Sequence, residues 1–265
     1  MKSYIEGILR TLLHATVSFA AIMFLLSGKA WAQKAPALTE TPSAEELLKA
    51  SDKARGGALL GLTWNVAIDT VEDKEKVSLS YVVKVKNSDA LAECSVPPKK
   101  KGETFVFNDR SLWYYKPGLK KPVSISSRQK LSGQAANGDI ASTNYARDYE
   151  GKILGEEVLD GKPVYKLELK AKAKNVTYDG IRYWISKDQR LGIKAEFLTL
   201  QGKVFKIAVF EYGNTLEMDG KSFPFVSKMT ITDAAFQENS TTMSYTKPVI
   251  QDHPASIFNV NNLIR

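Results

Sequence analysis

The feature that most constrains this chain is a two-residue alternation of apolar and polar side chains that starts near residue 60. From Leu60 to Ile68 every even position is apolar, and the positions between them are small or polar. Such alternation is typical of a β-strand with one buried face and one solvated face. It recurs along the chain in further sets: Leu79, Tyr81, Val83 and Val85; Phe105 and Phe107; Tyr165, Leu167 and Leu169; Ile181, Tyr183 and Ile185; Phe205, Ile207 and Val209; Phe223, Phe225, Met229 and Ile231; Thr241, Met243 and Tyr245.

Turn-forming residues separate these alternating runs. Gly, Asn and Asp tolerate the positive φ that tight hairpins require. Strands joined by short turns form an antiparallel meander, and a sheet of about ten strands must curl. The sequence therefore predicts a mainly β domain, built from one curled antiparallel sheet with a single apolar face. The predicted turns are Asn108-Asp109, Asp160-Gly161, Lys187-Asp188, Gln201-Gly202 and Asp219-Gly220.

The first 32 residues have the three parts of a secretory signal peptide. Lys2 and Arg10 give a positive start, residues 11–27 are almost wholly apolar, and Ala30-Trp31-Ala32 matches a cleavage site. An N-terminal membrane anchor is the alternative, but this apolar run is at the short limit for spanning a bilayer. We predict cleavage after Ala32 and a periplasmic location. Because no cysteine lies near Ala32, we expect no lipid anchor on the mature chain.

Composition argues against several classes of protein. The formal net charge of +8 falls to +6 without the signal peptide, so we expect no nucleic-acid partner. Cys94 is the only cysteine, which excludes a disulfide framework within the chain. We expect it to be a buried thiol in the sheet, with a reactive thiol or an intermolecular bridge as the alternatives. His253 is the only histidine after residue 32, and we expect it to be exposed in a loop or to neighbour a helix cap.

The same scarcity argues against catalysis. His253 is the only histidine that a catalytic triad could use, and one histidine with one cysteine cannot form a usual zinc site. The chain has no P-loop and no dinucleotide-binding glycine motif. Paired carboxylates of the glycosidase type stay open as an alternative, although Glu156-Glu157, Asp148 and Glu150 are typical of turns and loops. We predict a binding protein with no enzymatic activity, no cofactor and no metal.

Helical signals are confined to short segments around the predicted sheet. After a flexible lead-in at residues 33–42, Ser43 and Glu46 form a capping box that predicts a helix over residues 43–55. Residues 127–149 are small and polar, and a loop of that length is usually functional or mobile. We expect a short helix over residues 138–148 there, and another over residues 254–265 that docks on the sheet.

Residues 105–117, FVFNDRSLWYYKP, carry a distinctive motif. They resemble the (S/N)DG-x-x-LW-(F/Y)-Y-x-P hairpin of LolA-like periplasmic lipoprotein carriers. Segments 181–188, 201–203, 212–225 and 256–265 also resemble that family, so the likeness extends over residues 43–265. It implies an incomplete (half) β-barrel, with helices that cover an apolar cavity able to hold lipoprotein acyl chains or another lipid.

On this resemblance we expect a soluble carrier that moves lipid toward the outer membrane, with an inner-membrane exporter and an outer-membrane acceptor as partners. An RseB-like regulatory or binding module and an accessory subunit of a lipid exporter are the alternatives. The family's lid-binding arginine has no counterpart in residues 83–88, so that role is not carried over. The predicted cavity lining is Trp64, Val66, Leu79, Tyr81, Val83, Phe105, Phe107, Phe205 and Ile207.

One basic run has two possible readings. Lys99, Lys100 and Lys101 follow two prolines and could contact anionic lipid head groups, or form a solvated loop.

Overall fold

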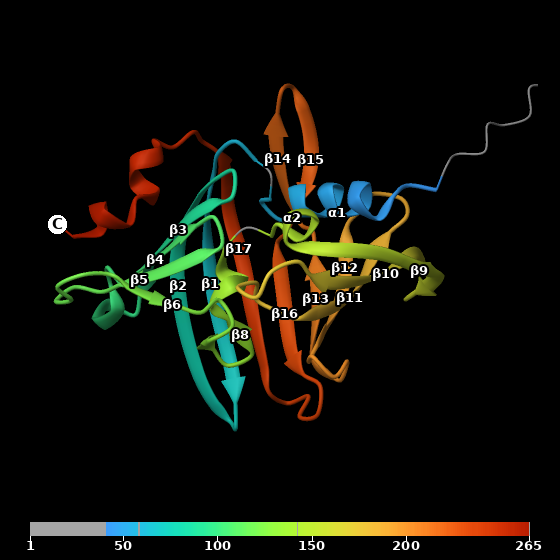
Figure 1. Ribbon diagram of the computed structural model, residues 1–265, viewed down its shortest axis with the longest axis horizontal. Helices are drawn as coiled ribbons and strands as arrows, with labels where there is room; N and C mark the ends of the chain where they lie inside the picture. Colours follow the sequence, from blue (N-terminus) through green and yellow to red (C-terminus); the bar gives the residue numbers. More distant parts are fainter. Residues whose placement is uncertain (1–40, 58, 142, 265) are drawn as a thin grey trace, which may run out of the picture. The chain divides into compact units, whose positions relative to one another are not determined.

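The computed structural model describes residues 41–57, 59–141 and 143–264. The predicted signal peptide (1–32) and residues 33–40 of the predicted lead-in lie outside this described part. The main element of the described chain is one antiparallel sheet of 13 strands (Figure 1). The expected fold class, mainly β with one large antiparallel sheet, is therefore confirmed.

The sheet consists of two meanders that meet where β1 pairs with β17, so that β6 and β9 form its two edges. The first meander contains β1 (Leu62–Glu72), β2 (Glu75–Lys86), β3 (Asp89–Val96), β4 (Thr104–Asn108), β5 (Ser111–Tyr115) and β6 (Val123–Ile125). The second contains β9 (Tyr149–Leu159), β10 (Lys162–Ala171), β11 (Gly180–Ser186), β12 (Gly192–Leu198), β13 (Val204–Glu211), β16 (Lys228–Asp233) and β17 (Ser240–Ile250).

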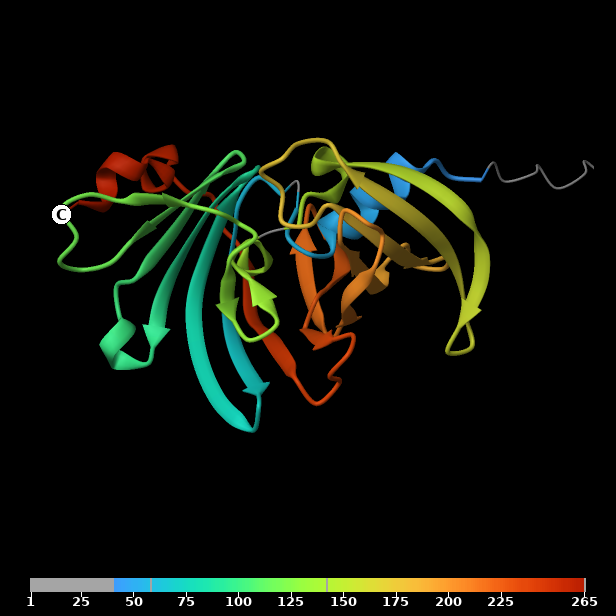
Figure 2. The same ribbon diagram turned by 60° about the horizontal axis from the view of Figure 1, so that its bottom comes forward.

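The sheet is curved and open. Figure 2 shows that the long strands β2 and β9 are bent along their length, and no pairing joins the edges β6 and β9. The predicted number of about ten strands is too low, because single-sequence patterns miss short strands and strands lined by small residues. β6 has three residues, and the buried face of β3 consists of Ala90, Ala92 and Cys94. Outside the main sheet, β14 (Asn214–Met218) pairs with β15 (Lys221–Phe225).

One face of the sheet, which we call the inner face, carries the buried side chains. On β1 these are the even positions, as the alternation predicts, although Leu60 precedes the strand and is exposed. The predicted hairpin turns are also present, except that the first is Asp109-Arg110, because Asn108 is the last residue of β4 and pairs with Ser111. Asp160-Gly161 and Asp219-Gly220 have positive φ at both residues, which is the backbone of a type I′ turn.

Helix α1 (Ala44–Lys53) lies where the capping box predicts it. The Ser43 backbone amide donates to Glu46 Oε2 at 2.8 Å, and the Glu46 amide donates to Ser43 Oγ at 3.2 Å. These two bonds satisfy free amides at the start of the helix. The apolar side of α1 packs on the inner face through the fully buried Leu47 and Leu48.

Residues 126–148 connect β6 to β9, and therefore lead from one edge of the sheet to the other. We call this segment the strap. It contains the small hairpin β7 (Lys130–Ser132) and β8 (Ala135–Ala136), the 3₁₀ turn η2 (Asn137–Ile140) and the single helical turn α2 (Tyr145–Asp148). The predicted helix over 138–148 thus exists only as two short turns, because a polar segment with two glycines has little helix propensity.

The C-terminal residues pack against the sheet as two 3₁₀ turns, η3 (Ala255–Phe258) and η4 (Val260–Leu263), where the sequence predicts one short helix. Phe258 is buried and η3 contacts β3 and β4. His253 is buried as well, so the expectation of an exposed histidine is wrong, although the residue does neighbour a helix cap, since Pro254 is the N-cap of η3. Its Nε2 lies 2.9 Å from Thr63 Oγ1, because the docking of Phe258 draws the preceding residues onto the sheet.

In the described part of the chain, no helix has the length and apolarity needed to cross a bilayer.

Strand β13 differs from its predicted alternation. Ile207 pairs with Glu196 and Thr232 on the outer face, whereas Ala208 and Phe210 are buried on the inner face. The cause is a register shift opposite Phe197/Leu198, which inserts an extra residue in β13 at Phe205. A β-bulge reverses the side-chain alternation beyond it. The structure thus removes Ile207 from the predicted lining.

This register can be tested with two matched lysine substitutions. Ala208→Lys places a charge in the packed inner face and is expected to cost several kcal/mol of unfolding free energy, about 3 or more. Ile207→Lys places the same charge opposite Glu196 on the outer face and is expected to cost about 1 kcal/mol or less. Urea unfolding of both variants measures the difference, and equal losses would contradict the bulge.

Candidate functional site

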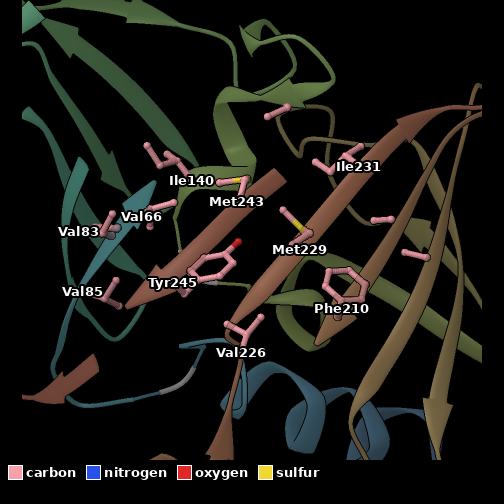
Figure 3. Packing of buried hydrophobic residues seen from close by; sticks show 14 of the residues in the cluster. Val66, Val83, Val85, Ile140, Phe210, Val226, Met229, Ile231, Met243 and Tyr245 are labelled. Carbon is pink, nitrogen blue, oxygen red and sulfur yellow. The ribbon is translucent and has the colours of Figure 1, made fainter. Parts of the chain in front are cut away.

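The centre of the inner face is a continuous apolar surface. Figure 3 shows side chains from both meanders converging there, with Val66 and Val83 on one side and Phe210 and Ile231 on the other. Met229 and Met243 are register partners in the middle, where β16 pairs with β17. Methionine is flexible and polarizable, so it adapts its shape to what packs against it. This surface is suited to bind a long apolar group without a fixed shape.

The structure brings eight of the nine predicted lining residues to this face. Phe107 and Phe205 are half-buried and pack against the cluster, Ile207 lies outside it, and the rest are buried members: Trp64, Val66, Leu79, Tyr81, Val83 and Phe105. Cys94 is buried beside this group, as expected, and its thiol donates to the Val96 carbonyl at 3.2 Å.

The strap covers the apolar surface with a small set of its own apolar side chains. Ala135 and Ile140 are completely buried against the cluster, and Leu131, Ala141, Tyr145 and Ala146 pack at its border. Ile140 reaches toward Met243 in Figure 3. Because three of these six side chains are alanine, the strap loses less apolar contact when it moves away than a helix with a full apolar side would lose.

Polar contacts hold the rim of the strap. At the β7–β8 hairpin, Ser132 Oγ lies 2.8 Å from Thr70 Oγ1, and the Gln134 amide donates to Thr241 Oγ1 at 2.9 Å. Lys206 Nζ donates to the Gln134 carbonyl at 2.6 Å. Gly133 between them has a φ of +49°, and a Cβ there would collide with Thr70 and Thr241. Only glycine lets the hairpin approach the sheet so closely.

The loop after β10 supplies a second set of polar contacts. Arg128 at the start of the strap donates from Nε to the Val176 carbonyl at 2.9 Å and pairs with Asp179 at 2.6 Å. Farther along, Tyr178 Oη donates to Asp139 Oδ2 at 2.7 Å.

The end of the strap is fixed to the β4–β5 hairpin by charged groups. Asp148 accepts from Arg110 Nε at 3.0 Å and from Arg147 Nε at 2.7 Å. Arg147 also pairs with Asp109 at 3.3 Å. These residues belong to the hairpin motif and to α2, so the motif noted in the sequence positions the end of the strap.

Asp52 fixes the strap to α1. Its Oδ2 accepts from the Ala146 amide at 2.8 Å, at the start of the helical turn α2. The other carboxylate oxygen, Oδ1, is buried without a hydrogen-bond partner among the described residues. Burial raises the pKa of Asp52 to about 7, although the amides of Ala146 and Tyr145 oppose this change. A carboxyl group with this pKa is about half protonated near pH 7.

Arg55 follows one turn later and is also buried. Its guanidinium donates to Tyr183 Oη at 3.3 Å and lies 4.0 Å from the centre of the Phe210 ring. Met229 Sδ is 3.8 Å from Nη2, and the Tyr145 ring of the strap lies on another side at 5.3 Å. Arg55 therefore places a positive charge against an apolar and aromatic part of the inner face.

Sequence reasoning did not identify Asp52 and Arg55. A signal was present, because Leu48, Ser51, Asp52 and Arg55 follow the i, i+3, i+4, i+7 spacing of the buried side of α1. Two charged residues on that side of a helix require a buried partner or a function.

The raised pKa of Asp52 leads to a prediction about stability. The carboxyl group of Asp52 has a pKa of about 7 in the folded state and about 3.9 in the unfolded state. The unfolding free energy of the protein therefore falls as the pH rises between these two values, by up to about 1.4 kcal/mol per pH unit. The Asp52→Asn variant keeps an acceptor for Ala146 and cannot ionise. Relative to this variant, the wild-type protein is therefore expected to lose unfolding free energy between pH 5 and pH 8.

Urea unfolding at both pH values, for both proteins, checks this. Asp219→Asn in the exposed β14–β15 turn is the matched control for the loss of one carboxyl group. The same difference in unfolding free energy between wild type and Asp52→Asn at pH 5 and pH 8 would contradict the assignment.

Known proteins share this geometry. A family model described as an uncharacterized protein matches residues 86–265, which is more than half of the chain. No curated protein matches the sequence. Among solved structures, a LolA superfamily protein from Nitrosomonas europaea is 27% identical with a TM-score of 0.75, and the match covers 84% of this chain and 100% of that chain.

Two further solved structures share the fold. A putative outer membrane lipoprotein-sorting protein domain from Vibrio parahaemolyticus is 23% identical with a TM-score of 0.69, covering 84% of this chain and 100% of its own. A DUF1329 family protein from Desulfovibrio piger is 18% identical with a TM-score of 0.69, covering 83% and 97%. The resemblance seen in residues 105–117 is thereby confirmed. The chain belongs to the LolA-like family.

Proposed function

We propose that this protein is a periplasmic carrier that binds lipoprotein acyl chains or another lipid on the inner face of its sheet. The observation that carries the proposal is the contrast between the two kinds of contact around the strap. The surface beneath it is apolar, whereas its rim is held by hydrogen bonds and ion pairs. Water can replace polar contacts at low net cost, so the cover can open while the sheet stays folded.

Binding requires no catalysis. Each CH₂ group of an acyl chain that moves from water to the inner face contributes about 0.8 kcal/mol. An acyl chain of sixteen carbons then contributes more binding free energy than Ile140 and its neighbours on the strap contribute when they occupy the surface. The proposal therefore includes displacement of the strap by the lipid, and return of the strap when an acceptor removes it.

The cellular role follows the same proposal. A signal peptide cleaved after Ala32 would deliver the domain of residues 43–265 to the periplasm, where an inner-membrane exporter would load it and an outer-membrane acceptor would unload it. The LolA superfamily neighbour from Nitrosomonas europaea supports this role by family, since it matches over its whole length. We assign no enzymatic activity to the protein.

Lipid occupancy is the first experiment. Native mass spectrometry of the mature protein, purified without detergent, is expected to show a population with bound lipid. The neutral probe N-phenyl-1-naphthylamine is expected to fluoresce on binding and to be displaced by long-chain alcohols or acids. A protein that carries no lipid and binds no probe would overturn the proposal.

Locking the strap tests how the lipid gains access. The hydroxyl oxygens of Thr70 and Ser132 are 2.8 Å apart, so Thr70→Cys and Ser132→Cys together place two thiols within reach of a disulfide. The oxidised double variant is expected to bind the probe at least tenfold more slowly than its reduced form, because the hairpin can no longer leave the sheet. Stopped-flow fluorescence measures the rates.

The single variant Thr70→Cys is the control, since it has one new thiol and the same buried Cys94. This single variant is expected to bind the probe at the same rate under oxidising and reducing conditions. Equal probe binding by the oxidised and reduced double variant would show that the strap does not control access.

A further inference from the structure

We propose that Arg55 binds the anionic head group of the carried lipid, in a small polar pocket beneath the strap. This inference rests on the proposed function and narrows it to lipids with a carboxylate or phosphate group. The inference is based on the position of the Arg55 guanidinium, which is buried and has no carboxylate partner. It contacts the apolar inner face on one side and lines the pocket on the other.

The partners of Arg55 do not neutralise its charge. Only 8% of the residue is exposed, and among the described residues no carboxylate oxygen lies within 4 Å of its guanidinium. Its contacts are the Tyr183 hydroxyl, the Met229 sulfur and the rings of Phe210 and Tyr145. A guanidinium has five N–H donors in a planar fork, which matches a carboxylate or a phosphate. Buried charges in proteins are normally paired, and an anionic ligand would supply the pair.

The adjoining pocket has the size of a head group. Its volume is about 80 Å³, and it lies between the strap, the β4–β5 hairpin and the loop after β10. A cavity needs only about 10–15 Å³ of such volume to hold one water molecule, so the pocket has room for a carboxylate or phosphate group. Its polar lining beside Arg55 includes Tyr145, Tyr178 and Asn175.

The other charged groups of the pocket already have partners. Arg110 and Arg147 pair with Asp148, and Arg147 also pairs with Asp109. Asp139 accepts from the Ala136 amide at 2.8 Å and from Tyr178 Oη at 2.7 Å.

Two aspartates near Arg55 are held by hydrogen bonds from backbone or tyrosine. Burial raises the pKa of Asp139, which favours its neutral form, and Asp52 Oδ2 accepts a hydrogen bond from the Ala146 amide of the strap. Arg55 is thus the cation of this pocket that a ligand anion can neutralise.

The position of the guanidinium also defines where the chain of such a lipid would lie. Met229 and Phe210, which contact Arg55, belong to the apolar surface that continues to Met243 and Tyr245 (Figure 3). A lipid with its anion at Arg55 would therefore extend its chain along the methionine-containing centre of the inner face. Ile140 of the strap occupies that centre in this structure, so the chain would replace it.

Three probes with one acyl chain length test the proposal: oleate, oleoyl lysophosphatidic acid and oleyl alcohol. Each competes with N-phenyl-1-naphthylamine below its micelle concentration. In the wild-type protein at least one of the two anions is expected to displace the probe at a concentration about tenfold lower than the alcohol. The stronger anion identifies the head group as a carboxylate or a phosphate. Equal potency of all three competitors would overturn the proposal, and this comparison needs no variant.

The Arg55→Met variant keeps the length and apolar contacts of the side chain and removes its charge. It is expected to bind oleyl alcohol within about twofold of wild type, and to lose the tenfold preference for the anion. Arg55→Lys is expected to retain part of the preference. Arg182→Met, which removes the same charge from the outer face of β11, is the matched control and is expected to retain all of it.

A merely structural Arg55, which holds the strap through the Tyr145 ring, predicts another result. Arg55→Met would then weaken or strengthen all three competitors by the same factor. A retained anion preference in a folded Arg55→Met variant, judged by its thermal unfolding, would equally overturn the proposal. Failure of every competitor and of the probe itself would instead contradict the proposed function.

Discussion

The structure depends on one topological constraint, which is that the chain must cross from one edge of the sheet to the other. β6 and β9 are the two edge strands, and they are also consecutive strands of the main sheet along the sequence. The strap that joins them passes over the inner face, and both of its ends are fixed in β-strands. Any conformation that makes the apolar surface accessible must move the middle of the strap while its ends stay in place.

The chemistry of the strap fits this constraint. Its inward side chains are few, and Ile140 is the largest that is completely buried. Its outer contacts use hydroxyls, amides and ion pairs, such as Thr70 with Ser132 and Arg128 with Asp179. Each hydrogen bond contributes a net stabilisation of about 1 kcal/mol. Together these contacts hold the strap in a defined position, but they do not hold it strongly. A large apolar strap would be part of the core, and the inner face would then be permanently closed.

Local signals in the sequence predicted the elements that depend on local physics. The Ser43 capping box fixed the start of α1, and the alternation on β1 identified its buried face. The features that the sequence did not predict depend on contacts between distant parts of the chain. The bulge at Phe205 exists only because β12 pairs with β13, and it moved Ile207 to the outer face. The strap has no periodicity of its own, since its conformation comes from the surfaces that it crosses.

The most informative site residue was hidden for a related reason. Arg55 stands beside two glycines at the end of a short helix, and in the sequence it resembles an ordinary C-terminal cation that interacts with the helix dipole. Only the three-dimensional structure shows that the Arg55 side chain contacts Phe210 and Met229. A carrier of neutral acyl groups gains nothing from a buried guanidinium, which costs desolvation energy in every conformation that buries it. The charge is consistent with selection among lipids by their head group, because an apolar surface alone distinguishes acyl chains mainly by length.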